Sequence, residues 1–342
     1  MMNYNDVLES ARKCIGPYCK ACNECNGKAC TNKIPGPGAK GIGDVAIRNY
    51  DMWKKIRLNM DVLVENSDID LSSELFGHLF KYPIFAGPVG AVQMHYGDCF
   101  TDLTYNDILV KACANHGILA FTGDGVNEEI VKSATTVIKA VNGLGIPTIK
   151  PWNLETIQKK MALVEESGAL AVAMDIDACG LPFLKNMTPK AGSKSVDELK
   201  EIVRMCKNRP FIVKGIMTVQ GALKAIEAGA SGIVVSNHGG RVLDQTLSTA
   251  EVLKDICDVC KGKITVLVDG GIRSGSDIFK ALALGADGVL IARPFVTSVY
   301  GAKDEGVEVY ISKLASELEE TMMMCGARSI KDIHHEMIKV CF

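Results

Sequence analysis

A histidine and an arginine three residues apart are the first candidates for chemistry in this sequence. His238 and Arg241 lie in the motif SNHGGR, where two glycines loosen the chain between them. Imidazole exchanges a proton near neutral pH, and a guanidinium group can bind both oxygens of a carboxylate. Together they could deprotonate a hydroxy acid while holding its acid group. The motif therefore indicates proton abstraction from a small carboxylic acid.

A single lysine interrupts the apolar segment IVKGI. Lys214 needs an anionic or electron-rich partner there, because an unpaired buried ammonium group is strongly unfavourable. The edge of a flavin ring would provide one. A salt bridge to a neighbouring carboxylate such as Asp175 is the alternative.

Two further motifs combine glycine and arginine. VDGGIRSG contains Arg273, and LIARP contains Arg293. Glycines let backbone N–H groups approach a phosphate, and the arginines supply charge-assisted hydrogen bonds. These motifs predict a phosphorylated ligand or cofactor, and glycine turns with solvent-facing arginines are the alternative.

Five of the thirteen cysteines crowd the first thirty residues as C-x4-C-x2-C-x2-C-x4-C. The run resembles a ferredoxin's cluster-binding segment, although its last spacing is longer and no proline follows. We predict a 4Fe–4S cluster there, with zinc or unliganded thiols as the alternatives. The predicted ligands are Cys19, Cys22, Cys25 and Cys30, with Cys14 as an alternative ligand. Without a secretory signal, the cysteines are expected to be reduced thiols or metal ligands rather than a disulfide framework.

The elements that must position these residues follow a repeat. Short apolar segments recur at intervals of about thirty residues from Tyr82 onward, each followed by a polar cluster and a helical pattern. Eight such segments begin at residues 82, 117, 145, 170, 210, 232, 264 and 288. Eight strand–helix units favour an α/β fold, a TIM (β/α)8 barrel, with a cysteine-rich N-terminal extension. An open doubly wound sheet is the competing fold, but no G-x-G-x-x-G follows the first segment.

In a barrel of this kind the active site lies where the strands end. Polar residues at those ends are Thr122, Lys150, Trp152, Asp175, Asp177, Lys214, Ser236, His238, Asp269 and Arg293. Helices are expected after Asn153, over Ser274 to Gly285, and over Glu308 to Cys325 as the eighth barrel helix. We therefore divide the chain into a cysteine-rich segment, 1–35, and a barrel, 36–342.

The composition narrows the function classes. The formal net charge is only -2, so no strongly basic balance indicates nucleic acid or a membrane surface. No apolar stretch approaches the roughly eighteen residues that span a bilayer, and the start of the chain lacks the apolar core of a secretory signal. A cytoplasmic enzyme with a small-molecule site is the expectation.

The sequence resembles the FMN-dependent 2-hydroxy-acid dehydrogenase/oxidase family, which includes glycolate oxidase and lactate oxidase. The resemblance runs through DIDLSSELFGHLFKYPIFAGPVGA, IVKGI, SNHGGRVLD and VDGGIRSGSDIFKALALGADGVLIARP to ELEETMMMCGARSIKDI. It implies that His238 takes the substrate proton, Arg241 binds the substrate carboxylate and Lys214 steadies the reduced flavin. Asp177 would pair with the histidine, with Asp175 as the alternative.

The resemblance also implies an FMN site and homotetramers. The implied FMN contacts are Pro88, Val89, Gly90, Thr122, Lys150, Lys214, Ser236, Asp269, Gly270, Gly271, Arg273, Ala292 and Arg293. Trp152 joins His238 and Arg241 as a substrate contact. The chain departs from the family in lacking two substrate-binding tyrosines, with Lys150 and Trp152 at one of these places. It also lacks a second carboxylate-binding arginine in DACGLPFLKN and has Ala292 where a glycine is usual.

The predicted reaction is oxidation of a small (S)-2-hydroxy acid, such as lactate or glycolate, to the 2-oxo acid. Electrons would pass to oxygen or to a redox carrier. Two alternatives stay open: a flavin barrel of another reaction type, such as an isopentenyl diphosphate isomerase, and a redox-sensing or electron-transfer flavoprotein.

Overall fold

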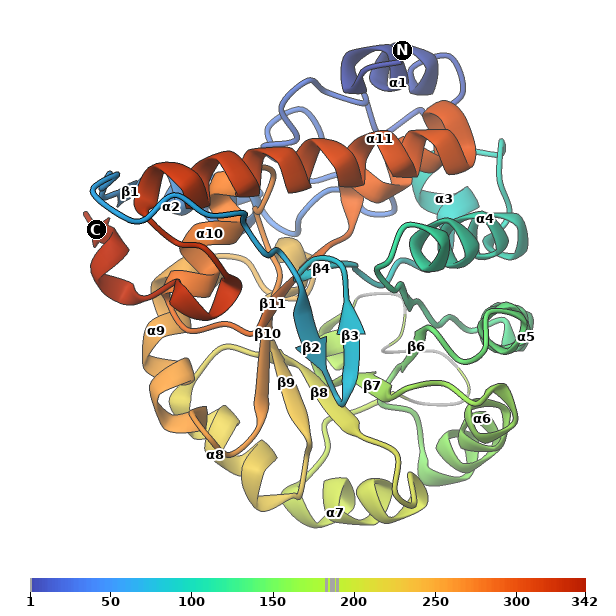
Figure 1. The fold of residues 1–342 in the computed structure, drawn as a ribbon. Helices are drawn as coiled ribbons and strands as arrows, with labels where there is room; N and C mark the ends of the chain where they lie inside the picture. Colours follow the sequence, from blue (N-terminus) through green and yellow to red (C-terminus); the bar gives the residue numbers. More distant parts are fainter. Residues whose placement is uncertain (1, 182–183, 185–187, 189–190) are drawn as a thin grey trace.

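Eight short parallel strands form a nearly closed barrel in the computed structural model, which describes residues 2–181, 184, 188 and 191–342 (Figure 1). The first strand pairs with the last, and a bridge between Ala86 and Ala120 joins the first strand to the chain that enters the second. This circular order rules out an open sheet and confirms the predicted barrel. The strands are β4 (Ile84–Ala86), β5 (Phe121–Thr122), β6 (Ile146–Ile149), β7 (Val172–Asp175), β8 (Phe211–Ile216), β9 (Gly232–Val235), β10 (Thr265–Val268) and β11 (Gly288–Ile291).

All eight apolar segments of the sequence contain one of these strands. Their residues are buried on both faces, which explains why the segments are continuously apolar rather than alternating. One face fills the barrel with side chains such as Phe85, Phe121 and Leu290. A hairpin of β2 (Ser73–Leu75) and β3 (His78–Phe80) closes the N-terminal end of the barrel, where Phe76 lies against Gly232.

The other face of the strands packs against surrounding helices (Figure 1). These are α4 (Asp102–Asn115), α5 (Glu128–Ala140), α6 (Leu154–Ser167), α7 (Val196–Met205), α8 (Val219–Glu227), α9 (Thr249–Cys260), α10 (Gly275–Ala283) and α11 (Arg293–Cys325). Asn153 and Ser274 cap α6 and α10, as predicted. After β11 a helix runs from Arg293 to a break at Ala302 and Lys303, and the helix beyond the break contains the predicted segment Glu308–Cys325.

The helix Asp44–Lys54, on the C-terminal side of the barrel, positions the site. The indole of Trp53, in α2 (Asp44–Lys54), donates to the carbonyl of Gly270 at 2.7 Å. Lys54 forms an ion pair with buried Asp277 of α10 at 3.0 Å. These contacts fix α2 against the loops that follow β9 and β10.

The N-terminal extension packs directly on the barrel. In α1 (Tyr4–Ala11), Val7 and Leu8 are buried, and Tyr4 stacks on Tyr310 of α11 with ring centroids 4.7 Å apart. Helix α1 lies beside α11 (Figure 1). Residues 12–43, all of which the structure describes, contain no helix or strand. Cys14 is bonded to Cys99 in a disulfide, which corrects its proposed place as an alternative metal ligand and the expectation that it is reduced.

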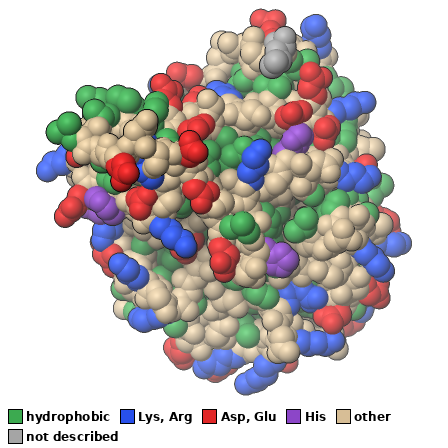
Figure 2. Space-filling model, in the orientation of Figure 1, with side chains coloured by type: hydrophobic (Ala, Val, Ile, Leu, Met, Phe, Trp, Pro, Cys, Tyr) green, Lys and Arg blue, Asp and Glu red, His purple; other side chains and the backbone are tan. Residues whose placement is uncertain are grey.

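The surface is of mixed charge. Acidic and basic side chains are interspersed on the face shown in Figure 2, without a continuous basic area. Among the described residues, no helix combines the length and apolar character needed to cross a membrane. The functional site is therefore expected at the mouth of the barrel.

Candidate active site

A cavity of about 360 Å³ lies at the C-terminal ends of the barrel strands. Its position agrees with the rule that barrels of this kind bind ligands at this end. The predicted residues that line it are Pro88, Val89, Gly90, Lys150, Asp175, Lys214, His238, Arg241, Asp269, Gly270, Gly271, Arg273, Ala292 and Arg293. The structure thus brings together residues from loops more than two hundred positions apart in sequence.

His238 and Asp177 form a close pair beside this cavity. The Nδ1 atom of His238 lies 3.0 Å from Oδ1 of Asp177, whereas Oδ1 of Asp175 is 3.9 Å away. His238 has a φ of 56°, and its backbone N–H donates to Ser236 Oγ at 3.1 Å. When Nδ1–H donates to the carboxylate, Nε2 becomes the basic nitrogen of the neutral ring. Asp177 is therefore the partner of the histidine.

Lys214 is the centre of a buried charge network. Its ammonium nitrogen lies 2.9 Å from Asp175, 3.5 Å from Asp269 and 3.1 Å from Ser236 Oγ. Burial favours the neutral lysine, but Asp175 and Asp269 raise its pKa well above the usual value. Burial likewise opposes the charged carboxylate, but Lys214 and His238 hold the pKa of Asp175 below its usual range. Lys214 thus forms the salt bridge to Asp175 that was the alternative interpretation, and it also lines the cavity, as a flavin contact would.

Arg241 is held at the cavity by the N-terminal segment. Its guanidinium group donates to the carbonyls of Gly36 and Gly38, and Nη2 lies 3.4 Å from Nε2 of His95. Burial lowers the pKa of Arg241 to about 10, so the side chain stays cationic at neutral pH. The backbone N–H of Gly36 donates to Nδ1 of His95 at 2.9 Å.

Lys150 brings a second cation into the cavity. The residue is 7% exposed and lines the cavity, and among the described residues its ammonium group makes no hydrogen bond and no ion pair, although its charge helps to lower the pKa of Asp175. Burial first, and then the charges of Arg241 and Lys150, lower the pKa of His95 to about 3. Two cations and a neutral histidine therefore surround one part of the cavity.

Trp152 does not line this cavity, which corrects its predicted contact with substrate. It is 1% exposed, and its indole N–H donates to Asp124 Oδ2 at 2.7 Å. Asp124 also accepts from the backbone N–H of Lys150 at 2.9 Å and from Lys160 at 2.6 Å. This buried carboxylate orients the loop after β6, because it fixes the backbone of Lys150 and the ring of Trp152 together.

The two arginines at the ends of β10 and β11 also contact the N-terminal segment. Arg273 Nε donates to the carbonyl of Cys25 at 2.9 Å, and Arg293 Nε donates to that of Pro37 at 2.8 Å. Gly271 has a φ of 82°, and a Cβ atom there would collide with the backbone of Asn49 in α2. Glycine is therefore required at 271 by the packing of α2, in addition to any approach of a phosphate.

The cavity suits a flavin mononucleotide. Lys214 offers a cation beside a ring, and Arg273 and Arg293 offer a cationic end for a phosphate. The hydroxyl of Thr122 and one oxygen of Asp269 are buried with no hydrogen-bond partner among the described residues. Ser236 is buried behind the wall, where it donates to Asp269 at 2.9 Å. The donor set and the unsatisfied polar atoms agree with a polar, negatively charged ligand.

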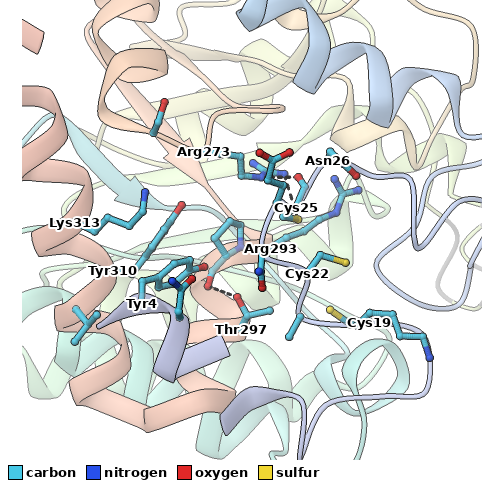
Figure 3. A pocket seen from close by; sticks show the side chains of 18 of the residues that line it. Tyr4, Cys19, Cys22, Cys25, Asn26, Arg273, Arg293, Thr297, Tyr310 and Lys313 are labelled. Atoms are coloured by element: carbon cyan, nitrogen blue, oxygen red, sulfur yellow. Dashed lines mark hydrogen bonds between the residues drawn. The ribbon is translucent and has the colours of Figure 1, made fainter. Parts of the chain in front are cut away.

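A second cavity, of about 860 Å³, is lined by Cys19, Cys22, Cys25 and Cys30. Figure 3 shows Cys19, Cys22 and Cys25 on one side of it and Tyr4 and Tyr310 on the other. Burial, and then the neighbouring thiols, raise the pKa of Cys19 to about 12. In the described part of the chain, the one group of three metal-ligating side chains with atoms within 4.8 Å of one another is Asp175, Asp177 and His238.

Residues 37–186 and 182–340 match the sequence model of the FMN-dependent dehydrogenase family. The chain belongs to this family. The resemblance seen in the sequence is thereby confirmed, and FMN is the cofactor of the family. The cysteine motif ends at Cys30, before the first matched residue.

Individual members of the FMN-dependent dehydrogenase family are similar over most of the chain. Glycolate oxidase of Spinacia oleracea is 44% identical over 331 residues, which cover 85% of this chain and 86% of that protein. A peroxisomal (S)-2-hydroxyacid oxidase, GLO3, of Arabidopsis thaliana is 33% identical over 328 residues, covering 85% and 87% of the two chains. A mandelate oxidase variant solved with an FMN adduct superposes with a TM-score of 0.74 at 27% identity, covering 88% and 93%.

The sequence missed three residues of the site. His95, Asp124 and Lys160 are buried beside or behind the cavity wall. Asp124 lies in the GDG turn that ends the second strand segment, so its position could have indicated it. His95 and Lys160 lie in helices and carry no signal of their own. Part of the segment DACGLPFLKN, residues 182–183 and 185–186, lies outside the described residues.

Proposed function

We propose that this chain oxidises a small (S)-2-hydroxy acid with one carboxylate to the corresponding 2-oxo acid in an FMN-dependent reaction. The observation that carries the proposal is the His238–Asp177 pair, at 3.0 Å, beside a cavity that Arg241 and Lys150 line with positive charge. A base next to an anion-binding pair suits an acid whose hydroxyl lies beside its carboxylate. The names of the relatives from Spinacia and Arabidopsis support the same substrate class.

His238 acts as the base in this proposal. Nε2 takes the proton from the α-hydroxyl or the α-carbon, and the ring becomes an imidazolium ion. Asp177 stabilises that ion and keeps the ring in the required tautomer, because it accepts from Nδ1. FMN, when bound, accepts the two electrons that leave the substrate. Lys214 would keep a positive charge beside the bound FMN, because the carboxylates of Asp175, Asp269 and Asp177 maintain the protonated lysine.

Arg241 and Lys150 hold the substrate carboxylate. Arg241 is fixed by the Gly36 and Gly38 carbonyls, which occupy part of its donor set and orient the rest. Lys150, which lies where the family has a substrate-binding tyrosine, supplies the second positive charge at the cavity. Because Lys150 is only 7% exposed, its ammonium group needs an anion beside it. The two charges define the position of the acid group relative to His238.

The cavity limits the size of the substrate. About 360 Å³ must accommodate a flavin ring together with the substrate, which favours a short side chain. We propose oxygen or a redox carrier as the electron acceptor. Assembly into homotetramers and a cytoplasmic location stay predictions, to be tested by sedimentation and by imaging.

Anaerobic titration of the FMN-loaded protein with glycolate, lactate and longer 2-hydroxy acids tests the function. At least one acid should reduce the flavin, as read from its absorbance. His238→Asn should slow this reduction by about 10²- to 10⁴-fold. His335→Asn, at an exposed position, is the matched control and should reduce at the wild-type rate. A bound flavin that no hydroxy acid reduces, or turnover of isopentenyl diphosphate instead, would overturn the proposal.

A further inference from the structure

The cysteine motif lies in a segment that the proposed reaction does not use. Residues 12–43 form a long connection without helix or strand, and such connections in compact proteins commonly have a function of their own. Among the cysteines, Cys14 is taken by Cys99, which leaves four thiols with the spacing C-x2-C-x2-C-x4-C. The fold thus separates one cysteine from the other four.

All four remaining cysteines line the same cavity of about 860 Å³. Each of the four is partly buried. The connection between α1 and α2 is wrapped around this space, with Arg12 donating to the carbonyl of Ala21 at 3.0 Å. Four thiols that converge from one loop are the ligand set of an iron–sulfur cluster or of a structural zinc ion.

The spacing of the cysteines in the sequence distinguishes these two ligands. Four thiolates on one zinc ion, each at about 2.3 Å, lie roughly 3.8 Å from one another. Among the described residues, no three cysteine sulfurs lie within 4.8 Å of one another. In a cubane cluster each thiolate binds a different iron atom, so the sulfurs are farther apart. The two consecutive C-x2-C steps match the first three ligands of a bacterial ferredoxin run, so the spacing of the cysteines favours the cluster over the single ion.

The charges around the cavity suit an anionic cluster. The guanidinium group of Arg273 lies 3.6 Å from the sulfur of Cys25 and also binds its carbonyl. Arg293 and Lys313 line the same cavity (Figure 3). Hydrogen bonds and positive charge at the sulfurs stabilise the thiolates and tune the cluster potential.

We propose that Cys19, Cys22, Cys25 and Cys30 bind a 4Fe–4S cluster beside the flavin cavity. Pro37, Arg273 and Arg293 line both cavities, so the two spaces are neighbours that share a wall.

The electron-accepting role of the cluster rests on the proposed function, whereas its binding does not. Oxidation of one 2-hydroxy acid releases two electrons and two protons. The cluster accepts one electron at a time, so the two electrons pass in succession to two molecules of a one-electron carrier protein, which is the oxidant. Both protons leave to solvent. The chain is then a dehydrogenase rather than an oxidase.

Metal and sulfide analysis of the full-length protein, purified without oxygen, tests the site. We expect about four iron atoms and four sulfide ions per chain, and a paramagnetic resonance signal after reduction with dithionite. One zinc ion per chain without sulfide would overturn the proposal. So would the absence of iron after incubation with ferrous iron and sulfide.

Cys22→Ser should lose the iron and the resonance signal, while Cys341→Ser, an exposed cysteine far along the chain, should keep both. Equal iron in Cys22→Ser and wild type contradicts the assignment. Should Cys22→Ser not fold, the wild-type analysis still decides. Iron bound beside a flavin that no hydroxy acid reduces would overturn the proposed function but leave the cluster. Flavin reduced by a hydroxy acid in a chain without iron would overturn the cluster alone.

Discussion

Lys150 places a positive charge in the cavity without a carboxylate beside it in the part of the chain that the structure describes. Lys150→Met should raise KM for the hydroxy acid about tenfold to a hundredfold, because a charged hydrogen bond to the carboxylate is lost. The effect on kcat should be smaller. Steady-state kinetics measure both.

Two variants control this experiment. Lys159→Met, on the exposed face of α6, should leave KM unchanged. Lys150→Arg should restore part of the affinity, because the charge is kept. An unchanged KM in Lys150→Met would show that Arg241 alone holds the acid group.

Asp177 and Asp175 should differ in what their loss changes. Asp177→Asn should reduce the rate of flavin reduction by about two orders of magnitude, because the imidazolium ion loses its partner. Asp175→Asn should instead lower the free energy of unfolding by about 3 kcal/mol, because buried Lys214 loses its nearest carboxylate. Rapid kinetics and urea unfolding separate the two effects. The reverse pattern would assign the histidine partner to Asp175.

His95 should make the protein sensitive to acid. Its pKa is about 3 in the folded protein, because burial and the charges of Arg241 and Lys150 oppose protonation. The unfolded chain takes up this proton near pH 6.5, so the stability is present above that pH and is lost as pH falls toward 3. The loss reaches about 1.4 kcal/mol per pH unit between these values.

His95→Asn tests this pH dependence, because its side-chain oxygen can still accept from Gly36. Unfolding by urea at several pH values between 6.5 and 4 should show a shallower decline in the variant than in wild type. Parallel declines would mean that other groups cause the acid sensitivity.

At the scale of the elements, the packing of α2 depends on one glycine. Gly271→Ala should destabilise the fold by about 2 kcal/mol or more, because φ is 82° and the backbone of Asn49 occupies the space a Cβ needs. Gly262→Ala is the matched control: its φ is 70°, but nothing lies within 4 Å of the added atom. Thermal unfolding should rank Gly271→Ala well below Gly262→Ala. Equal losses would show that backbone strain alone explains both.

The barrel elements could be read from the sequence because buried parallel strands are continuously apolar and each ends in a polar turn. The pairing of His238 with Asp177 was predicted from the resemblance to the family, which left Asp175 as the alternative; the converging strand ends alone do not choose between these two carboxylates. The helical segment from Arg293 to the break at Ala302 and Lys303 was not predicted, whereas the segment beyond the break contains the predicted helix Glu308–Cys325.

The role of His95 could not be predicted. Its position depends on Gly36, 59 residues earlier, in a segment without regular structure. Trp152 was assigned to substrate because it lies where the related family has a substrate-binding tyrosine, but its indole N–H donates to the buried carboxylate of Asp124. Sequence spacing located strand ends, and only packing decided which side chains turn inward.

At the scale of the whole molecule, the N-terminal extension and the barrel should unfold together. Leu8 and Ala11 of α1 belong to the same buried cluster as the barrel helices. Leu8→Ala should lower the free energy of unfolding by about 2–5 kcal/mol in a single transition. Leu63→Ala, at a side chain 94% exposed, should have no such effect. Two separate transitions, with only the first one shifted, would show that residues 1–35 are an independent unit.

Arg273 and Arg293 form part of the wall that the two cavities share. This shared wall couples the cavities while the protein is assembled. Each arginine binds a backbone carbonyl of the N-terminal segment while it faces the flavin cavity. Whatever orders that segment also orders these arginines, and such coupling is reciprocal. Under the proposal of a cluster, insertion of iron would therefore prepare the place of the flavin. Protein assembled without iron is then expected to hold its flavin less tightly.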